Sequence, residues 1–151
     1  MKTMLRGIAL LVATLAFACC FADTDKAVTG FADLKAVVAS TDALVFRGDG
    51  KAILTHTDFA LMPEGKKRER ETELLSGKGV ASLFKYQRRE IIDARDFATC
   101  SGSASPALHY TRTPEKFVVY WYVRPDGSTL PFSFPVFQEQ GQWRFAAGYL
   151  D

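Results

Sequence analysis

The sequence predicts an α+β domain, in which an N-terminal amphipathic helix packs on a curved antiparallel sheet of about five to six strands. The sheet is predicted because three runs rich in aromatic and β-branched residues, at 117–123, 130–137 and 142–149, follow one another with Gly-bearing turns between them. The helix is predicted because apolar residues within 28–39 recur every three or four positions.

A secretory signal is predicted at residues 1–22, which leaves a single domain at 23–151. Lys2 and Arg6 form a short basic region, an apolar core follows, and Ala22 supplies the small residue before a cleavage site. Because that core is too short to cross a bilayer, we expect no transmembrane segment in the mature protein. The predicted location is therefore the periplasm or the exterior of the cell.

Two alternatives stay open for the processing of this signal. Cleavage after Ala18 would also follow a small residue, and lipidation of Cys19 or Cys20 would anchor the protein as a lipoprotein. A lipoprotein signal normally has Leu three residues before the cysteine, where this chain has Ala16 and Phe17. The departure favours the unanchored form.

After cleavage at Ala22, the mature domain holds one cysteine, Cys100, and equal numbers of basic and acidic residues. The whole chain has 19 Lys and Arg against 17 Asp and Glu, and Lys2 and Arg6 lie in the signal. A neutral surface does not favour nucleic acid or an anionic membrane as a partner. A lone cysteine forms no intramolecular disulfide, so the domain depends on its core and a buried, inert thiol is expected. Earlier cleavage would leave a second cysteine able to pair with Cys100.

The first elements are predicted to be a helix at 28–39 and a β-hairpin at 43–56. Ser40-Thr41-Asp42 is expected to end the helix, because these residue types favour turns. The hairpin would pair 43–46 with 51–56 across the turn Arg47-Gly-Asp-Gly50, whose glycines accept positive φ at little cost. The apolar face of the helix consists of Val28, Phe31, Leu34, Val37 and Val38.

The middle of the chain is its most polar part. The stretch 64–73 is expected to be a solvated segment or a short surface helix, with Glu64 and Arg68 paired at helical spacing. After it, 80–86 is ambiguous between a helical turn and a strand, and 88–99 is predicted to be a strand. A loop is predicted at 100–106 and a short strand at 108–111.

The strand at 117–123 is predicted to be central, because it has large apolar residues on both faces. Pro131 and Pro135 share one parity of the next strand and remove two hydrogen-bond donors on the same side, which a central strand does not tolerate. Either this strand lies at an edge of the sheet, or its pairing with the last strand begins only near Val136. The second alternative is favoured, with a bend or bulge at Pro135.

The candidate catalytic and metal-binding residues form no recognisable pattern. His56 and His109 lie in separate segments without ligand spacing. A thiolate–imidazolium pair of Cys100 with His109 is conceivable, but a core thiol and a surface histidine explain these residues more simply. Asp93 and Asp96 fall on opposite faces of their predicted strand. We therefore predict no catalytic residue, no metal site and no cofactor.

Aromatic residues gather in the C-terminal third of the chain. Core packing explains most of them, and the functional interpretation is an apolar pocket between sheet and helix, oriented by tyrosine hydroxyls. Tyr120 and Tyr122 share one face of their strand. The predicted ligand-binding residues are Tyr120, Tyr122, Phe132, Phe134 and Trp143.

The ending Gln140-Gly-Gln-Trp-Arg-Phe-Ala-Ala-Gly-Tyr149 resembles the closing strand of small secreted proteins with the NTF2-like (cystatin-like α+β) fold. In these proteins a turn glycine, a Trp-Arg pair and a Gly-Tyr step commonly finish the domain. The sequence departs from them in showing one clear N-terminal helix instead of two or three. It also lacks the Asp/His pair that isomerase and dehydratase members use. The resemblance therefore implies the fold but not the catalysis.

Three functions remain open. The leading prediction is an exported, non-enzymatic binding domain that holds a small apolar ligand or a protein partner. The second is a periplasmic inhibitor or immunity-type protein that blocks a toxin or lysozyme with the loop 100–106. The third is a small NTF2-like enzyme with His109 or Asp93 as its base, and a homodimer is left open in each case.

The signal sequence gives the first testable prediction. Because Ala22 satisfies the cleavage rule and the lipidation pattern is incomplete, the mature protein should begin at Asp23. Intact-mass spectrometry of the protein recovered from the periplasm measures this directly. A diacylglycerol-bearing species that begins at Cys19 or Cys20 would contradict it.

Overall fold

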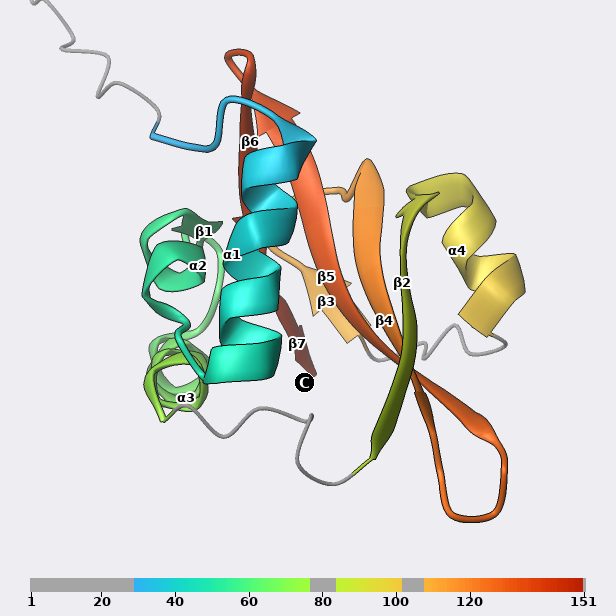
Figure 1. The fold of residues 1–151 in the computed structure, drawn as a ribbon. Coiled ribbons are helices and arrows are strands. Elements are labelled where there is room, and N and C mark those ends of the chain that lie inside the picture. Colours follow the sequence, from blue (N-terminus) through green and yellow to red (C-terminus); the bar gives the residue numbers. More distant parts are fainter. Residues whose placement is uncertain (1–28, 77–83, 102–107, 151) are drawn as a thin grey trace, which may run out of the picture.

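Three of the four described helices precede strands β2 to β7 along the chain (Figure 1). The computed structural model describes residues 29–76, 84–101 and 108–150, and the predictions for the signal, for 80–83 and for most of the loop at 100–106 lie outside them. The elements are α1 (Leu34–Arg47), α2 (Lys51–Thr55), β1 (Thr57–Asp58), α3 (Glu64–Leu75), β2 (Lys85–Asp93), α4 (Ala94–Ser101), β3 (Leu108–Tyr110), β4 (Lys116–Val123), β5 (Thr129–Glu139), β6 (Gln142–Ala146) and β7 (Gly148–Leu150).

The main sheet has five strands in the order β1-β6-β5-β4-β2. It is mixed and not fully antiparallel as predicted, because β1 runs parallel to β6 with Thr57 opposite Phe145. The other pairs in this sheet are antiparallel. The last predicted strand is also divided at Ala147, so that β6 joins the main sheet and β7 pairs with the short strand β3. The α+β class is confirmed.

Strand β4 lies between β5 and β2 and has structure on both of its faces, as predicted. Its even-numbered residues, Val118, Tyr120 and Tyr122, belong to a core that also contains residues of α1, α2 and α3. Its odd-numbered residues, Phe117, Val119 and Trp121, form a second core with residues of α4. Figure 1 shows α1 and α4 on opposite sides of the sheet. One strand therefore connects two hydrophobic layers.

The prolines of β5 lie where the sequence pattern placed them. Pairing of β5 with β6 begins at Val136, opposite Phe145, which confirms the expected start. Pro131 and Pro135 consequently lie in the part of β5 that has β4 as its one neighbouring strand. The register with β4 runs without a shift from Val136 to Thr129, so the bulge expected at Pro135 is not formed.

The first helix begins and ends later than predicted. Asp33 caps α1 by accepting a hydrogen bond from the Ala36 amide at 2.8 Å. Ser40 and Thr41 do not end the helix, because their hydroxyls donate to the carbonyls of Val37 (2.7 Å) and Val38 (3.0 Å) within it. The buried positions continue at helical spacing through Val37, Thr41, Leu44 and Val45.

The predicted hairpin at 43–56 is wrong. Residues 43–46 form the last turn of α1, and 51–55 form α2. Gly48 adopts the left-handed conformation (φ 71°) and donates to the Leu44 carbonyl at 2.9 Å, which is the usual glycine-dependent end of a helix. The Gly-Asp-Gly sequence is thus a helix cap and a link between helices, not a strand-to-strand turn.

The predicted strand at 88–99 is half strand and half helix. Strand β2 starts earlier, at Lys85, and ends at Asp93, after which Ala94 donates to the Glu115 carbonyl at 2.9 Å. Helix α4 follows because residues three apart then share a face against β4, where the Phe97 ring stacks on Phe117 with centroids 4.1 Å apart. The short strand at 108–111 is confirmed as β3.

The charged stretch 64–73 belongs to a surface helix, α3, which is one of the two alternatives predicted for it. Glu64 and Arg68 pair at 3.6 Å, the contact expected from their spacing. Leu74 is the buried residue of this helix and joins the core on the α1 side of the sheet.

Two glycines provide a matched test of how tightly these helices pack. A Cβ added at Gly50 would lie 2.2 Å from the Leu74 carbonyl oxygen, whereas one added at Gly65 would meet nothing within 4 Å. Gly50→Ala should therefore cost about 3 kcal/mol of unfolding free energy, and Gly65→Ala should be neutral or stabilise α3 by up to about 1 kcal/mol. Urea denaturation of the two variants measures this, and equal stabilities would mean that α2 and α3 are not packed at Gly50.

Candidate functional site

The five predicted ligand-binding residues all lie on the α1 side of the sheet. Tyr120, Tyr122, Phe134 and Trp143 are buried members of the core there, and Phe132 is partly buried against them. The structure therefore brings the predicted residues together, from β4, β5 and β6. Most of their surface fills the core, so their polar atoms and their exposed neighbours decide what this region can bind.

A polar network surrounds the hydroxyl of Tyr120. The hydroxyl donates to Asp42 Oδ1 at 2.6 Å and lies 2.7 Å from Thr41 Oγ1. Arg89 donates through Nη1 to both carboxylate oxygens of Asp42. Because Asp42 is on α1, Arg89 on β2 and Tyr120 on β4, the network joins the helix to two adjacent strands. A buried hydroxyl with an ionised acceptor forms one of the stronger hydrogen bonds in proteins.

This environment sets the protonation state of Tyr120. Burial, together with the hydrogen bond to Asp42, raises the pKa of the Tyr120 phenol well above its ordinary value of 10.0. The side chain is therefore a neutral hydrogen-bond donor at neutral pH. The same carboxylate raises the pKa of Arg89. Because their pKa values are raised, Tyr120 and Arg89 hold their protons and have little capacity to act as a general base at neutral pH.

Four aromatic rings meet beside this network, and we call Phe46, Tyr86, Tyr120 and Tyr122 the aromatic cluster. Phe46 and Tyr86 meet edge to face with centroids 5.2 Å apart, and the Tyr86 ring lies 6.1 Å from Tyr122. Phe46 is 50% exposed and Tyr86 is 40% exposed, whereas Tyr120 and Tyr122 are fully buried. The cluster thus runs from the surface into the core, a geometry that suits apolar contact.

The hydroxyl of Tyr122 is the unusual group of the aromatic cluster. Its oxygen is buried and has no hydrogen-bond partner among the described residues. Burial raises the pKa of this phenol, so it is a neutral donor. A buried polar group without a partner costs about 1–3 kcal/mol, and native proteins leave few such groups. The Tyr122 hydroxyl is therefore available to a bound molecule that brings its own acceptor or donor.

A second charged network lies at the other side of the sheet. Arg112 donates to Asp58 Oδ2 at 2.6 Å and lies 3.6 Å from Glu139, which accepts from Arg144 at 2.6 Å. Burial opposes ionisation of Asp58, but the Ala60 amide and Arg112 outweigh it and hold the pKa of Asp58 below its ordinary value. Two acids and two bases alternate here, so the network neutralises itself and has the character of a structural contact.

The other residues of interest in the sequence lie in separate elements. His56 Nδ1 is 3.4 Å from the Thr29 carbonyl, and His109 on β3 lies beside the Tyr149 ring at 5.7 Å. Asp93 accepts a hydrogen bond from Lys116 at 2.5 Å, and this contact lowers its pKa. The side chain of Cys100 is outside the described set. Within the residues that the structure describes, no three His, Cys, Asp or Glu side chains are placed to hold a metal ion.

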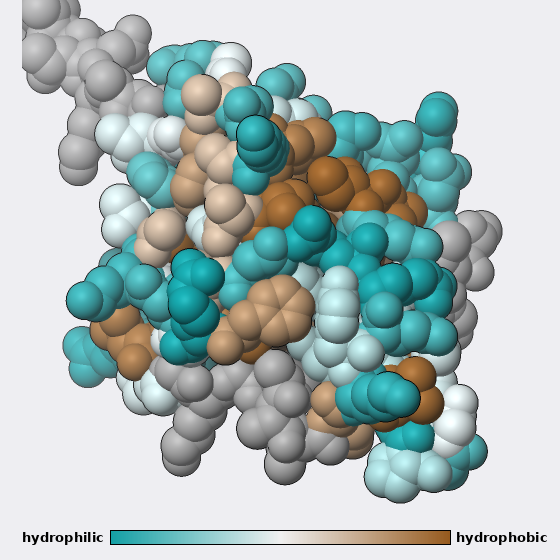
Figure 2. Space-filling view, in the orientation of Figure 1, coloured by the Kyte–Doolittle hydropathy of each residue, from teal (hydrophilic) through white to brown (hydrophobic). Residues whose placement is uncertain are grey.

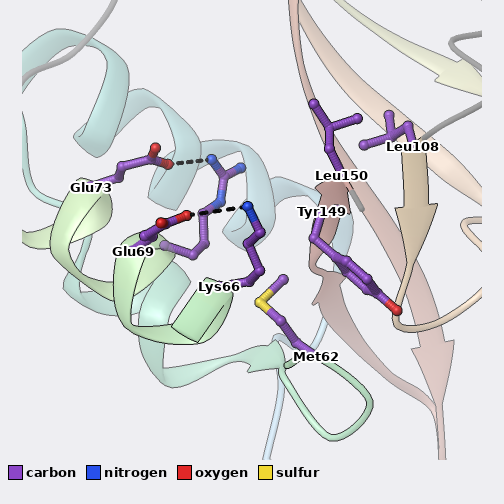
Figure 3. A pocket seen from close by; sticks show the side chains of 9 residues that line it. Met62, Lys66, Glu69, Glu73, Leu108, Tyr149 and Leu150 are labelled. Atoms are coloured by element: carbon purple, nitrogen blue, oxygen red, sulfur yellow. Dashed lines mark hydrogen bonds and ion pairs between the residues drawn. The ribbon is translucent and has the colours of Figure 1, made fainter. Parts of the chain in front are cut away.

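A groove of about 220 Å³ separates α3 from the β3–β7 pair (Figure 3). Its apolar lining consists of Met62, Tyr149 and the exposed residues Leu108 and Leu150. The charged groups on the α3 side are already paired, Lys66 with Glu69 at 3.8 Å and Arg70 with Glu73 at 2.8 Å. The groove therefore offers little unsatisfied polarity to a ligand, in contrast to the aromatic cluster.

Comparisons of the chain with protein-family models, curated proteins and solved structures give no match. Among the described helices, none combines the length and apolar character needed to cross a membrane. The site must therefore be interpreted from its own geometry.

The sequence indicated only part of this site. Asp42 was assigned to a helix end, Phe46 to a hairpin, and Tyr86 to an ambiguous segment, so their convergence on Tyr120 was not visible. Arg89 belongs to β2, in register opposite Tyr120. The available signal was the helical spacing of Leu34, Val38 and Asp42, which would have placed Asp42 on α1 facing the sheet.

Replacement of Tyr120 by Phe tests the polar network. The variant should lose about 1–3 kcal/mol at neutral pH, because Asp42 loses a buried donor. Since the folded-state pKa of Tyr120 is raised, its contribution is full below the unfolded-state pKa of about 10 and declines as pH rises above it. The difference in unfolding free energy between wild type and variant should therefore shrink above about pH 10. A difference that is absent at neutral pH, or constant to high pH, would contradict this role.

Proposed function

We propose that this protein is an exported, non-enzymatic binding domain, which holds a small molecule with an apolar body and one hydrogen-bonding group. The observation that carries the proposal is the fully buried Tyr122 hydroxyl, which has no hydrogen-bond partner among the residues described and lies at the inner end of the aromatic cluster. A ligand that hydrogen-bonds to this hydroxyl would remove the free-energy cost of leaving a buried polar group unpaired. The rings of Phe46 and Tyr86, half exposed at the outer end, would contact its apolar body.

We also propose that the fold is NTF2-like. The resemblance of the C-terminal ending is supported by the order of the elements, because three helices, α1, α2 and α3, precede the strands β2 to β7. The sequence alone showed one clear helix, and two or three are usual for that fold. The helix count of this chain is therefore within the range usual for that fold.

Binding explains the electrostatics of the domain better than base catalysis does. The pKa of Asp93 is lowered by Lys116, which makes this carboxylate a weaker base than an ordinary aspartate. The pKa of Tyr120 is raised, so it is not poised to lose a proton near neutral pH. Each of these shifts stabilises the resting protonation state, whereas an acid–base catalyst needs a pKa near the working pH.

Tyr122→Phe is the direct test, because it removes only the unpartnered hydroxyl. Without ligand, its unfolding free energy should equal that of the wild type or exceed it, since no hydrogen bond is lost. Small aromatic ketones, phenols and medium-chain fatty acids should be screened by thermal shift. A molecule that stabilises the wild type through this hydroxyl should bind the variant about tenfold more weakly.

Tyr149→Phe is the matched control, because Tyr149 lies in the groove beside α3 and outside the aromatic cluster. It should leave ligand affinity unchanged. Destabilisation of the ligand-free Tyr122→Phe protein, or equal affinity of all three proteins for every probe, would contradict the proposal. Recovery of one hydrolase in stoichiometric amount with the native protein would instead favour the inhibitor prediction.

A further inference from the structure

We propose that the protein forms a homodimer through antiparallel pairing of β2 with β2 of a second copy, with Ile91 at the two-fold axis. Strand β2 is nine residues long and is the last strand of the five-stranded sheet, bonded to β4 on one side. No described strand pairs with its other side. An edge of this length presents a row of backbone donors and acceptors that a second strand can use.

The position of β2 leaves its outer edge accessible. Figure 1 shows β2 at the end of the sheet, with α1 on one side of it and α4 on the other. Its residues are all exposed or half-exposed, as expected if none of the described helices or strands covers this edge. The opposite end of the sheet differs, because its last strand, β1, has only two residues. Strand β2 is therefore the edge that offers a second copy enough length to pair.

An apolar residue lies on this edge. Ile91 is 44% exposed, and its register partner Val118 faces the α1 side of the sheet, so Ile91 faces that side as well. Figure 2 shows hydrophobic surface beside α1, near the end of β2 that leads into α4. The surface along the rest of β2 is mainly hydrophilic. Pairing of two copies at this point would remove part of the apolar surface from water.

The sequence of β2 selects the register. The bulge at Gln87 leaves Arg88–Asp93 as the regular part of the strand. In a two-fold antiparallel pair a residue on the axis lies opposite itself, so an axis at Arg89 or at Glu90 would oppose like charges. An axis at Ile91 places two isoleucines together and puts each Arg89 opposite Asp93 of the second copy. An axis at Ile92 would leave most of the strand unpaired.

Arg89 and Asp93 can each form a further hydrogen bond across the proposed interface. Arg89 uses Nη1 for Asp42, and a guanidinium has five N–H donors in all. Asp93 accepts from Lys116 through Oδ1, and its side chain is partly exposed. The resulting Arg89–Asp93 contacts are exposed, so they would select the register more than they would add affinity. With a short strand and one apolar pair, the dimer should be weak and dependent on concentration.

Cysteine cross-linking tests the register. In a background where the three native cysteines are serine, Ile91→Cys should give a disulfide-linked dimer under mild oxidation, because residues opposite each other at the axis have Cα atoms about 4.5–5.5 Å apart. Gln87→Cys is the control on the same exposed strand. Its two copies would be about 26 Å apart in this register, so its dimer should be nearly absent.

Disruption of the dimer tests its existence independently. Ile91→Lys would place two ammonium groups together at the axis and should abolish the dimer seen by sedimentation equilibrium of the wild type at high concentration. Leu61→Lys is the control, because Leu61 is 69% exposed and lies outside β2, and this variant should leave the dimer unchanged. A wild type that stays monomeric, equal cross-linking of both cysteine variants, or a dimer that survives Ile91→Lys would overturn the proposal. The bulge and charges of β2 would then act only to keep the edge unpaired.

Discussion

The burial of β4 on both faces is the constraint on which the rest of the domain depends. Val118, Val119, Tyr120 and Tyr122 are inaccessible to solvent, although they point alternately to opposite sides of the sheet. Such a strand is stable only if helices or loops cover both sides. Helix α1 meets this requirement on one side and α4 contributes on the other, so an unbroken run of buried residues in β4 goes with helices on both sides of the sheet.

The polar residues of α1 show how tertiary contacts outweigh local preference. Ser40, Thr41 and Asp42 together favour the end of a helix, and a helix end was predicted there. In the structure the two hydroxyls bond to carbonyls of the same helix, while Asp42 accepts from Tyr120 and Arg89. These partners lie far along the chain, so nothing in the local sequence reveals them. The same contacts extend the helix and create the polar part of the candidate site.

The sheet was more predictable than the helices for a physical reason. Strands β4, β5 and β6 follow one another through short turns, such as the one where Gln140 and Gly141 both have positive φ, so local sequence determines the order of these three strands. The proline positions even gave the start of β5–β6 pairing at Val136. The Gly48–Gly50 segment was misassigned because glycine serves equally to end a helix and to turn a hairpin. That error also hid Phe46 from the candidate site.

Two tyrosines on one strand of this domain differ in what their hydroxyl groups contact. Tyr120 and Tyr122 are two residues apart, share a face and are equally buried, so the sequence treats them alike. The hydroxyl of Tyr120 donates a hydrogen bond to Asp42, and this bond stabilises the contact between α1 and the sheet. The hydroxyl of Tyr122 has no hydrogen-bond partner in the part of the chain that the structure describes, and phenylalanine would fill nearly the same space without a desolvation cost. The packing of the described residues therefore accounts for the ring of Tyr122 but not for its oxygen, and the binding function that we propose would account for both.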